Sequence, residues 1–311
     1  EPERTNLIQY SEDFSEWTTT GSATVTPNTT TSPDGAQNAD TLNIVSGDFF
    51  FEPITSGAGT FTLSCYVKVA SGTLDFKMQS YSLTDGANAS SNFTANSNWQ
   101  RFEFTTTVTV DSNFYPIQVS GLTGGDFQIW GGQVEAGSYA TSYIPTNGES
   151  GGVTRLQDQY EKTGISDLIN SEEGVLFVEM AALSDDGTFR ILSLTNSGSI
   201  GSNRILLYYS SNSNAIVYEI TSNATTILIY SHTLSDSTET IKAAIKYKQN
   251  DFAFWVNGVE VNTVNSGNTP SGLNNLAFTN GASGNPFYGK VKQLQIYKTA
   301  LTDKELQTLT T

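Results

Sequence analysis

The sequence has a single cysteine and a single histidine among its 311 residues. One thiol permits no disulfide within the chain, so the fold must be stabilised by packed cores. Cys65 lies in the alternating run FTLSCYVKV and is predicted to be a small buried hydrophobe rather than a reactive thiol. Zinc needs several His or Cys ligands at set spacings, and the sequence has no such pair. His232 is accompanied by no G-x-S-x-G elbow, so a Ser-His-Asp triad is not predicted.

Charged residues are also scarce, at 15% of the chain, and most of them are acidic. Lys and Arg number 15 against 31 Asp and Glu, which gives a net charge of −16. This charge repels phosphate backbones and anionic lipid headgroups, so we expect neither nucleic acid nor a membrane as a partner. The sequence has no apolar run long enough to span a bilayer, and its first ten residues do not resemble a signal peptide. Neutral glycans and Ca²⁺ remain compatible with the composition.

Short runs of alternating apolar and polar residues fill most of the chain. Between Phe61 and Val69 every second residue is apolar, the period of a strand with one buried face. Such runs recur between Gly- and Asn-rich turns, and Asn257-Gly258 is the strongest hairpin signal. They predict an all-β fold of two antiparallel β-sandwich (jelly-roll) domains in tandem, residues 1–150 and 151–311, joined by the Gly- and Ser-containing stretch 146–152.

The two domain ends have distinct patterns. Thr302 and Glu305 form a capping-box pattern ahead of an apolar stripe, which predicts a short C-terminal helix. In the first domain, WGGQVEAGSYATSYIPT predicts a last strand that ends near Glu135. The aromatic side chains of Tyr139 and Tyr143 are then expected to pack back on the domain.

Five segments of the first half carry a resemblance to a known class of module: NLIQYSEDFSEW, SPDGAQNADTL, FTLSCYVKVASG, NWQRFEFTTT and IWGGQVEAGSYATSYIPT. They resemble jelly-roll modules, similar to carbohydrate-binding modules, of phage tail and virion proteins. In the second half, GVLFVEM, FRILSL, KAAIKY, FAFWVNGVEV and GKVKQLQIYKTALTDKEL resemble laminin-G-like, concanavalin A-like lectin domains. The resemblance implies jelly-roll folds, a surface-attachment or glycan-binding role, and a place on a virion surface or outside the cell.

Calcium is the one cofactor that the sequence leaves open. In related carbohydrate-binding modules a structural Ca²⁺ is often held by an acid near the first strand and by an Asp-Asp-Val element in the last. Asp13 matches the first ligand, but Gly132-Gln133-Val134 replaces the second. Asp185 and Asp186 are further candidates by residue type. The alternative interpretation of all three acids is a solvated turn.

Aromatic and amide side chains are the candidate sugar ligands, because sugar C–H faces stack on rings and hydroxyls pair with polar groups. The selected residues are Trp130, Tyr81, Asn92, Tyr208 and Tyr209. Trp130 precedes two glycines that leave room for an exposed ring. Neighbouring residues on a strand face opposite sides, so one of Tyr208 and Tyr209 must leave the core, and Phe50 must oppose Phe49 and Phe51. Packing between domains or oligomer contacts would use outward rings equally well.

Three functions are compatible with these patterns. The first is non-catalytic glycan binding, as a host-surface recognition module of a phage virion or a secreted surface protein, with a cell-surface polysaccharide as partner. The second is structural decoration or homo-oligomerisation within a larger virion assembly, without sugar binding. The third is a polysaccharide depolymerase, which needs two carboxylates across a cleft. The Glu-x-Asp-x-x-Glu string of the glucanase relatives is missing, so we predict no enzyme activity.

Overall fold

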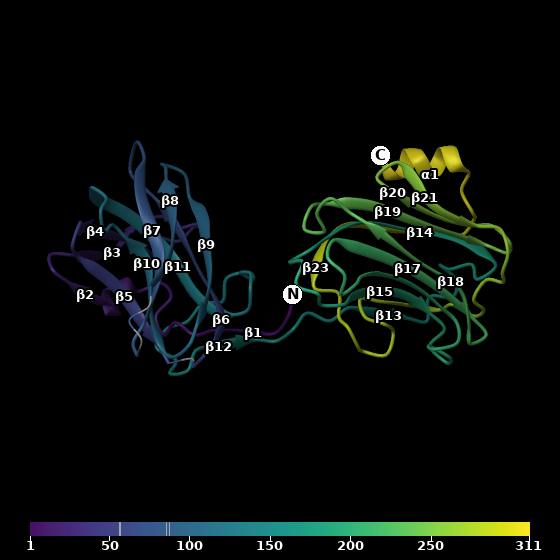
Figure 1. Ribbon diagram of the computed structural model, residues 1–311, viewed down its shortest axis with the longest axis horizontal. Helices are drawn as coiled ribbons and strands as arrows, with labels where there is room; N and C mark the ends of the chain where they lie inside the picture. Colours follow the sequence, from purple (N-terminus) through teal and green to yellow (C-terminus); the bar gives the residue numbers. More distant parts are fainter. Residues whose placement is uncertain (56, 85, 87) are drawn as a thin grey trace. The chain divides into compact units, whose positions relative to one another are not determined.

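A computed structural model describes residues 1–311 except 56, 85 and 87 (Figure 1). The chain divides into two compact units, Pro2–Gln157 and Asp158–Thr311, with Glu1 grouped with the second. Every paired strand in both units is antiparallel, and the described part of the chain holds a single α-helix, at its C-terminal end. The prediction of an all-β fold with a short C-terminal helix is confirmed.

The first sandwich consists of two five-stranded sheets. The order β2-β5-β10-β7-β8 of one sheet and β3-β4-β11-β6-β9 of the other place strands distant in sequence side by side, as in a jelly roll. The strand bounds in sheet order are β2 (Thr18–Thr20), β5 (Phe49–Ile54), β10 (Ser112–Gln118), β7 (Leu74–Ser82), β8 (Asn88–Ala95), then β3 (Thr24–Thr30), β4 (Ala39–Val45), β11 (Gly124–Ala136), β6 (Gly59–Lys68) and β9 (Gln100–Val108).

The alternating apolar side chains of the strands fill the core of this sandwich, as the sequence predicts. Cys65 is fully buried between its strand neighbours, and burial raises the pKa of its thiol to about 12. The short 3₁₀ helix η1 (Phe14–Glu16) adds a second aromatic layer. The rings of Trp17 and Phe50 stack with their centroids 5.2 Å apart, and Phe14 packs against both. The first unit also runs past residue 150, because β12 (Val153–Arg155) pairs with β1 (Arg4–Asn6).

The second sandwich joins a six-stranded sheet to a five-stranded one. The bounds in sheet order are β13 (Glu161–Thr163), β22 (Asn275–Ala277), β15 (Arg190–Thr195), β16 (Arg204–Tyr209), β17 (Ala215–Ser222), β18 (Thr225–Thr233), then β21 (Val259–Val264), β20 (Phe252–Val256), β19 (Ile241–Lys248), β14 (Glu173–Ala182) and β23 (Gly289–Tyr297). Asn257 and Gly258 both have positive φ, 49° and 80°, and link β20 to β21 by the predicted tight turn.

Helix α1 (Asp303–Thr310) lies on the outer face of the five-stranded sheet of the second sandwich (Figure 1). Leu306 is fully buried against Phe177 and Trp255. The predicted capping box is present. The Thr302 side chain accepts a hydrogen bond from the Glu305 backbone N–H, and the Glu305 carboxylate accepts one from the Thr302 backbone N–H. We call this surface the helix-covered face.

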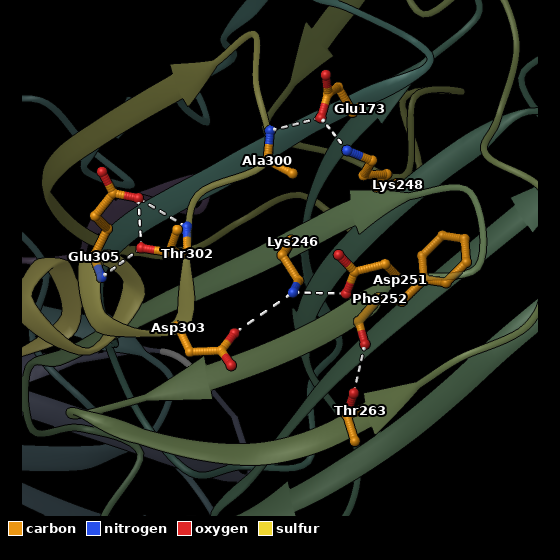
Figure 2. Close-up of polar contacts among 10 residues, drawn as sticks. All are labelled: Glu173, Lys246, Lys248, Asp251, Phe252, Thr263, Ala300, Thr302, Asp303 and Glu305. Atoms are coloured by element: carbon orange, nitrogen blue, oxygen red, sulfur yellow. Dashed lines mark hydrogen bonds and ion pairs between the residues drawn. The ribbon is translucent and has the colours of Figure 1, made fainter.

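Polar contacts hold the helix and its approach to the sheet (Figure 2). The Lys246 ammonium lies 2.7 Å from a carboxylate oxygen of Asp251 and 3.6 Å from one of Asp303. The Ala300 backbone N–H donates to Glu173, which also pairs with Lys248. The helix therefore docks through a leucine in the centre and ion pairs at the margin. It has only eight residues, and none of the described helices is long and apolar enough to cross a membrane.

Candidate functional site

Aromatic rings gather on the outer face of the sheet β2-β5-β10-β7-β8 in the first sandwich. On β5, Phe50 points into the core with no exposure, so Phe49 and Phe51 point outward, and Phe49 is 42% exposed. The Tyr115 ring of β10 lies 5.1 Å from Phe51 and 6.3 Å from Phe49, measured between centroids, and its neighbours leave it only 6% exposed. We call the outward rings of Phe49, Phe51 and Tyr115, together with Tyr81, the aromatic face.

Strand register places Tyr81 beside this group. Tyr81 of β7 pairs with Asn113 of β10, two residues before Tyr115, and therefore shares its face of the sheet. On its other side Tyr81 pairs with Asn88 of β8. The side chains along β7 alternate strictly, with Met78 and Ser80 buried and Tyr81 half-buried between solvent and sheet.

Uncharged amide side chains surround the rings. The Gln79 amide donates to the Asn88 carbonyl oxygen over 2.8 Å, and Gln79 pairs across the sheet with Tyr115. Asn92 is exposed on β8, opposite Lys77, whose ammonium donates to the Ser120 backbone carbonyl. The predicted residues Tyr81 and Asn92 thus come from adjacent strands of one sheet.

The electrostatic character of the face is close to neutral. Burial raises the pKa of the Tyr115 phenol, which a hydrogen bond from Asn113 partly offsets and the neighbouring Tyr81 reinforces. A neutral phenol can both donate and accept a hydrogen bond. The face therefore offers ring surfaces for C–H groups and neutral polar groups for hydroxyls.

Trp130 does not contribute an exposed ring, contrary to the sequence prediction. It is 5% exposed and packs between Tyr66, at 5.4 Å, and Tyr143, at 4.6 Å between centroids. The chain that leaves β11 covers it, which confirms the predicted return of Tyr143. Gln133 fastens this segment by accepting a hydrogen bond from the Ile144 N–H over 2.7 Å. Gln133, at the position where the related modules have a calcium ligand, thus binds a backbone N–H of the exit segment.

Tyr208 and Tyr209 lie on opposite sides of β16, as the alternation predicts. Tyr209 is a core residue, 3% exposed, so its selection as a sugar ligand is wrong. Tyr208 packs on the outer face of the six-stranded sheet with Ile191, Leu206 and Val217, and only 8% of it is exposed. Its ring lies 6.0 Å, between centroids, from the tilted ring of the more exposed Phe189.

The second outer face differs from the aromatic face in its charges. The Arg204 guanidinium pairs with the Glu219 carboxylate over 2.7 Å, across β16 and β17. Burial raises the pKa of the Tyr208 phenol. The charge of Glu219 adds to this shift and that of Arg204 opposes it, which places Tyr208 beside the ion pair. One buried tyrosine with an internally matched ion pair presents less ring surface than the aromatic face.

The three proposed metal ligands are engaged by donors of the protein itself. Asp13 caps η1 and accepts hydrogen bonds from the Ser15 N–H and hydroxyl. Asp185 accepts from Ser213 and the Asn214 N–H, and Asp186 from the Thr188 N–H and from Arg190, which is 2% exposed. Within the described ranges no group of three or more His, Cys, Asp or Glu residues is arranged to hold a metal ion.

Residues 176–307 match the model of the concanavalin A-like lectin/glucanases superfamily. The match lies within the second sandwich and supports the lectin-like character predicted for that half. No curated protein matches this sequence.

Similar folds occur among solved structures. The family 40 carbohydrate-binding module of a Ruminococcus gnavus sialidase, bound to α2,3-sialyllactose, is 16% identical, with a TM-score of 0.40, over 49% of this chain and 98% of its own. A pentraxin of Limulus polyphemus is 14% identical, with a TM-score of 0.40, over 49% of this chain and 76% of its own. Sheep galectin-11 is 8% identical, with a TM-score of 0.33, over 46% of this chain and 99% of its own. Identities and scores this low carry no information about ligands.

Sequence reasoning missed Tyr115, which lies at the centre of the aromatic face. Its run, SNFYPIQ, is buried throughout and has no clean alternation, since a register shift follows Tyr115. The sequence predicted that Phe49 and Phe51 share one side of their strand, but the alternation does not reveal which strand lies next to β5. The signal for Tyr115 is the strand pairing, which only the fold provides.

Proposed function

We propose that this protein is a non-catalytic glycan-binding protein and that the aromatic face of the first sandwich holds the sugar. The observation that carries the proposal is the group of accessible rings of Phe49, Phe51 and Tyr81, packed around the buried ring of Tyr115 and bordered by Gln79, Asn88, Asn92 and Asn113. Pyranose rings present C–H faces that stack on such rings, and their hydroxyls pair with amide side chains. The lectin-superfamily match of the second sandwich is consistent with this role.

The ligand that fits this face is an uncharged polysaccharide or oligosaccharide. The four rings extend from β5 to β7 across three adjacent strands, so several sugar units can lie along them. A net charge of −16 disfavours acidic glycans by long-range repulsion. Attachment to a host cell from a virion or secreted surface protein is the biological role that the sequence resemblance favours.

A glycan array followed by titration calorimetry of the selected oligosaccharide tests the proposal. We expect Phe51→Ala and Tyr81→Ala each to weaken binding by about two- to tenfold, since a lost stacking ring contributes about 0.5–1.5 kcal/mol. Tyr160→Ala is the matched control, because Tyr160 is an exposed ring, 53% exposed, of the second sandwich. An array without hits, or equal losses in the control, contradicts the proposal.

The same titration in the presence of EDTA tests whether calcium is needed for binding. Asp13, Asp185 and Asp186 remain predicted ligands, and the proposed stacking does not use them. We therefore expect EDTA to leave the affinity for the glycan unchanged. A loss of binding in EDTA that Ca²⁺ restores would show that an ion organises the site.

The exposed rings also favour a second candidate, self-association into a larger assembly. Phe49 leaves apolar surface uncovered that a second copy of the chain could bury. Light scattering distinguishes the two functions. A monomer at every concentration contradicts self-association, whereas an oligomer that Phe49→Asp dissociates supports it.

A further inference from the structure

A cleft of about 500 Å³ opens in the first sandwich, away from the aromatic face residues. Its wall is formed by the chain before η1, by the β3–β4 hairpin and by the segment between β11 and β12. The lining residues are Glu12, Asp13, Pro27, Asn28, Asn38, Asp40, Pro145, Thr146, Asn147 and Glu149. The proposed glycan face does not use this cleft, and of its lining residues the sequence resemblance assigns a role only to Asp13, as a calcium ligand.

Hydrogen-bond acceptors outnumber donors in the wall. Four carboxylates line the cleft, and no Lys, Arg or His does. Glu12 accepts from the Tyr143 hydroxyl over 3.0 Å and from the Asn38 amide over 2.9 Å, which uses one bond per oxygen. Glu149 accepts the Asn147 N–H on a single oxygen. A carboxylate has about four lone-pair sites, so acceptor capacity remains.

Two buried acceptors of the wall have no partner at all. Thr146 is only 5% exposed, and its hydroxyl oxygen forms no hydrogen bond. The Asn38 amide nitrogen donates to Glu12 and to Asp34, which leaves the carbonyl oxygen of Asn38 as the second unpartnered atom. A buried polar atom without a partner destabilises the folded state, so a ligand that donates to Thr146 and Asn38 would remove that penalty.

The chemistry of the missing partner follows from the charge of the wall, which has four carboxylates and no cationic side chain. Glu12, Asp13, Asp40 and Glu149 do not form a group that could hold one metal ion, as no three His, Cys, Asp or Glu side chains do elsewhere in the described residues. Acidic groups that cannot converge on a single ion can still each meet a different donor of a larger cation. The ligand therefore needs a positive charge and several N–H or O–H donors spread over a few ångströms.

We propose that this cleft binds an amino sugar with a free ammonium group, as in a de-N-acetylated glucosamine oligosaccharide. Its ammonium would pair with the carboxylates of Glu12 and Glu149, and its hydroxyls would donate to Thr146 and Asn38. The cleft volume accommodates one or two sugar units. The site is separate from the aromatic face, so it stands independently of the function proposed above.

Titration calorimetry with a glucosamine tetramer and with its N-acetylated counterpart tests the charge requirement. We expect the free amine to bind on the order of tenfold more tightly or better, and its affinity to fall between low and high salt, because partly exposed ion pairs are screened. Equal affinity for both tetramers would overturn the proposal. Phe51→Ala should leave this binding unchanged, which separates it from binding at the aromatic face.

Variants of the wall locate the site. Glu149→Gln removes a charge from an exposed position, and we expect roughly tenfold weaker binding of the amine. Glu103→Gln, an exposed glutamate of β9, is the matched control with the same change in net charge. Thr146→Val should weaken binding while Thr146→Ser retains it, with thermal unfolding measured for both. Loss in neither Glu149→Gln nor Thr146→Val, or the same loss in Glu103→Gln, would refute the site.

Discussion

The aromatic face and the helix-covered face are both outer surfaces of sandwich sheets, and both carry aromatic side chains. On the helix-covered face, α1 places Leu306 over Phe177 and Trp255, which are 1% and 6% exposed. On the aromatic face no described helix covers the rings, and Phe49 remains 42% exposed. An outward aromatic residue is therefore not itself evidence of a binding site. What distinguishes the two faces is whether the same chain supplies a cover.

The comparison is tested most strongly within β5, where neighbouring phenylalanines face opposite ways. Phe50→Ala should destabilise the first sandwich by about 4 kcal/mol, because it leaves a cavity beside Trp17 and Phe14. Phe49→Ala should cost less than about 1 kcal/mol, because its ring is largely in solvent already. Urea unfolding followed by tryptophan fluorescence measures both. Equal losses would mean that Phe49 is packed and that the aromatic face is not open.

Removing the cover of the other face is the next largest effect. Leu306→Ala should destabilise the second sandwich by about 3 kcal/mol, since the leucine is fully buried against the sheet. It should also expose Trp255, which a red shift of fluorescence or binding of a hydrophobic dye would detect. Gln307→Ala, on the exposed side of α1, is the control and should change neither quantity. An unchanged stability in Leu306→Ala would indicate that α1 is not a structural cover.

The smallest effect is a difference in pH dependence. Hydrogen bonds from the Thr302 hydroxyl and N–H lower the pKa of Glu305, and the Ala300 N–H and Lys248 lower that of Glu173. The contribution of both groups to stability is therefore complete above the ordinary glutamate range and is lost as the pH falls through their lowered values. Glu52 has the opposite sign, because burial raises its pKa and protonation stabilises the folded state.

Denaturant unfolding between pH 3 and 7 checks this difference through two variants. Glu305→Gln should reduce the stability that the second sandwich loses as the pH falls. Glu52→Gln should remove the stability that the first sandwich gains as the pH falls. The same slope in Glu305→Gln and in the unchanged protein would show that the capping box does not respond to pH.

Local pattern was sufficient for several features of the fold. The alternation around Phe50 and around Tyr208-Tyr209 predicts that neighbouring rings face opposite sides of the sheet, because side chains on a strand alternate. The capping box at Thr302 and Glu305 and the Asn257-Gly258 turn are equally local, since each depends on a few consecutive residues. Such features need no knowledge of what lies across the sheet.

Other features depend on partners distant in the sequence. Trp130 was predicted to have room for exposure because glycines follow it, but Tyr143 returns from the exit segment and covers the ring. Asp185 fits a calcium ligand by residue type, but the fold places the Ser213 hydroxyl and the Asn214 N–H against it. Tyr115 joins Phe51 only through the pairing of β10 with β5. In each case the decisive contact has no signature in the neighbouring residues.

The sequence by itself determined the all-β class, the alternation of side chains between the two sides of a strand and, with one cysteine, the impossibility of a disulfide within the chain. These follow from residue types and from the two-residue period of a strand. Tertiary structure alone decided which outward rings are covered, where Thr146 and Asn38 lack partners, and that Phe49, Phe51, Tyr81 and Tyr115 share one sheet. The physical reason is that burial and hydrogen bonding depend on neighbours in space, whereas a strand pattern specifies only the direction of each side chain.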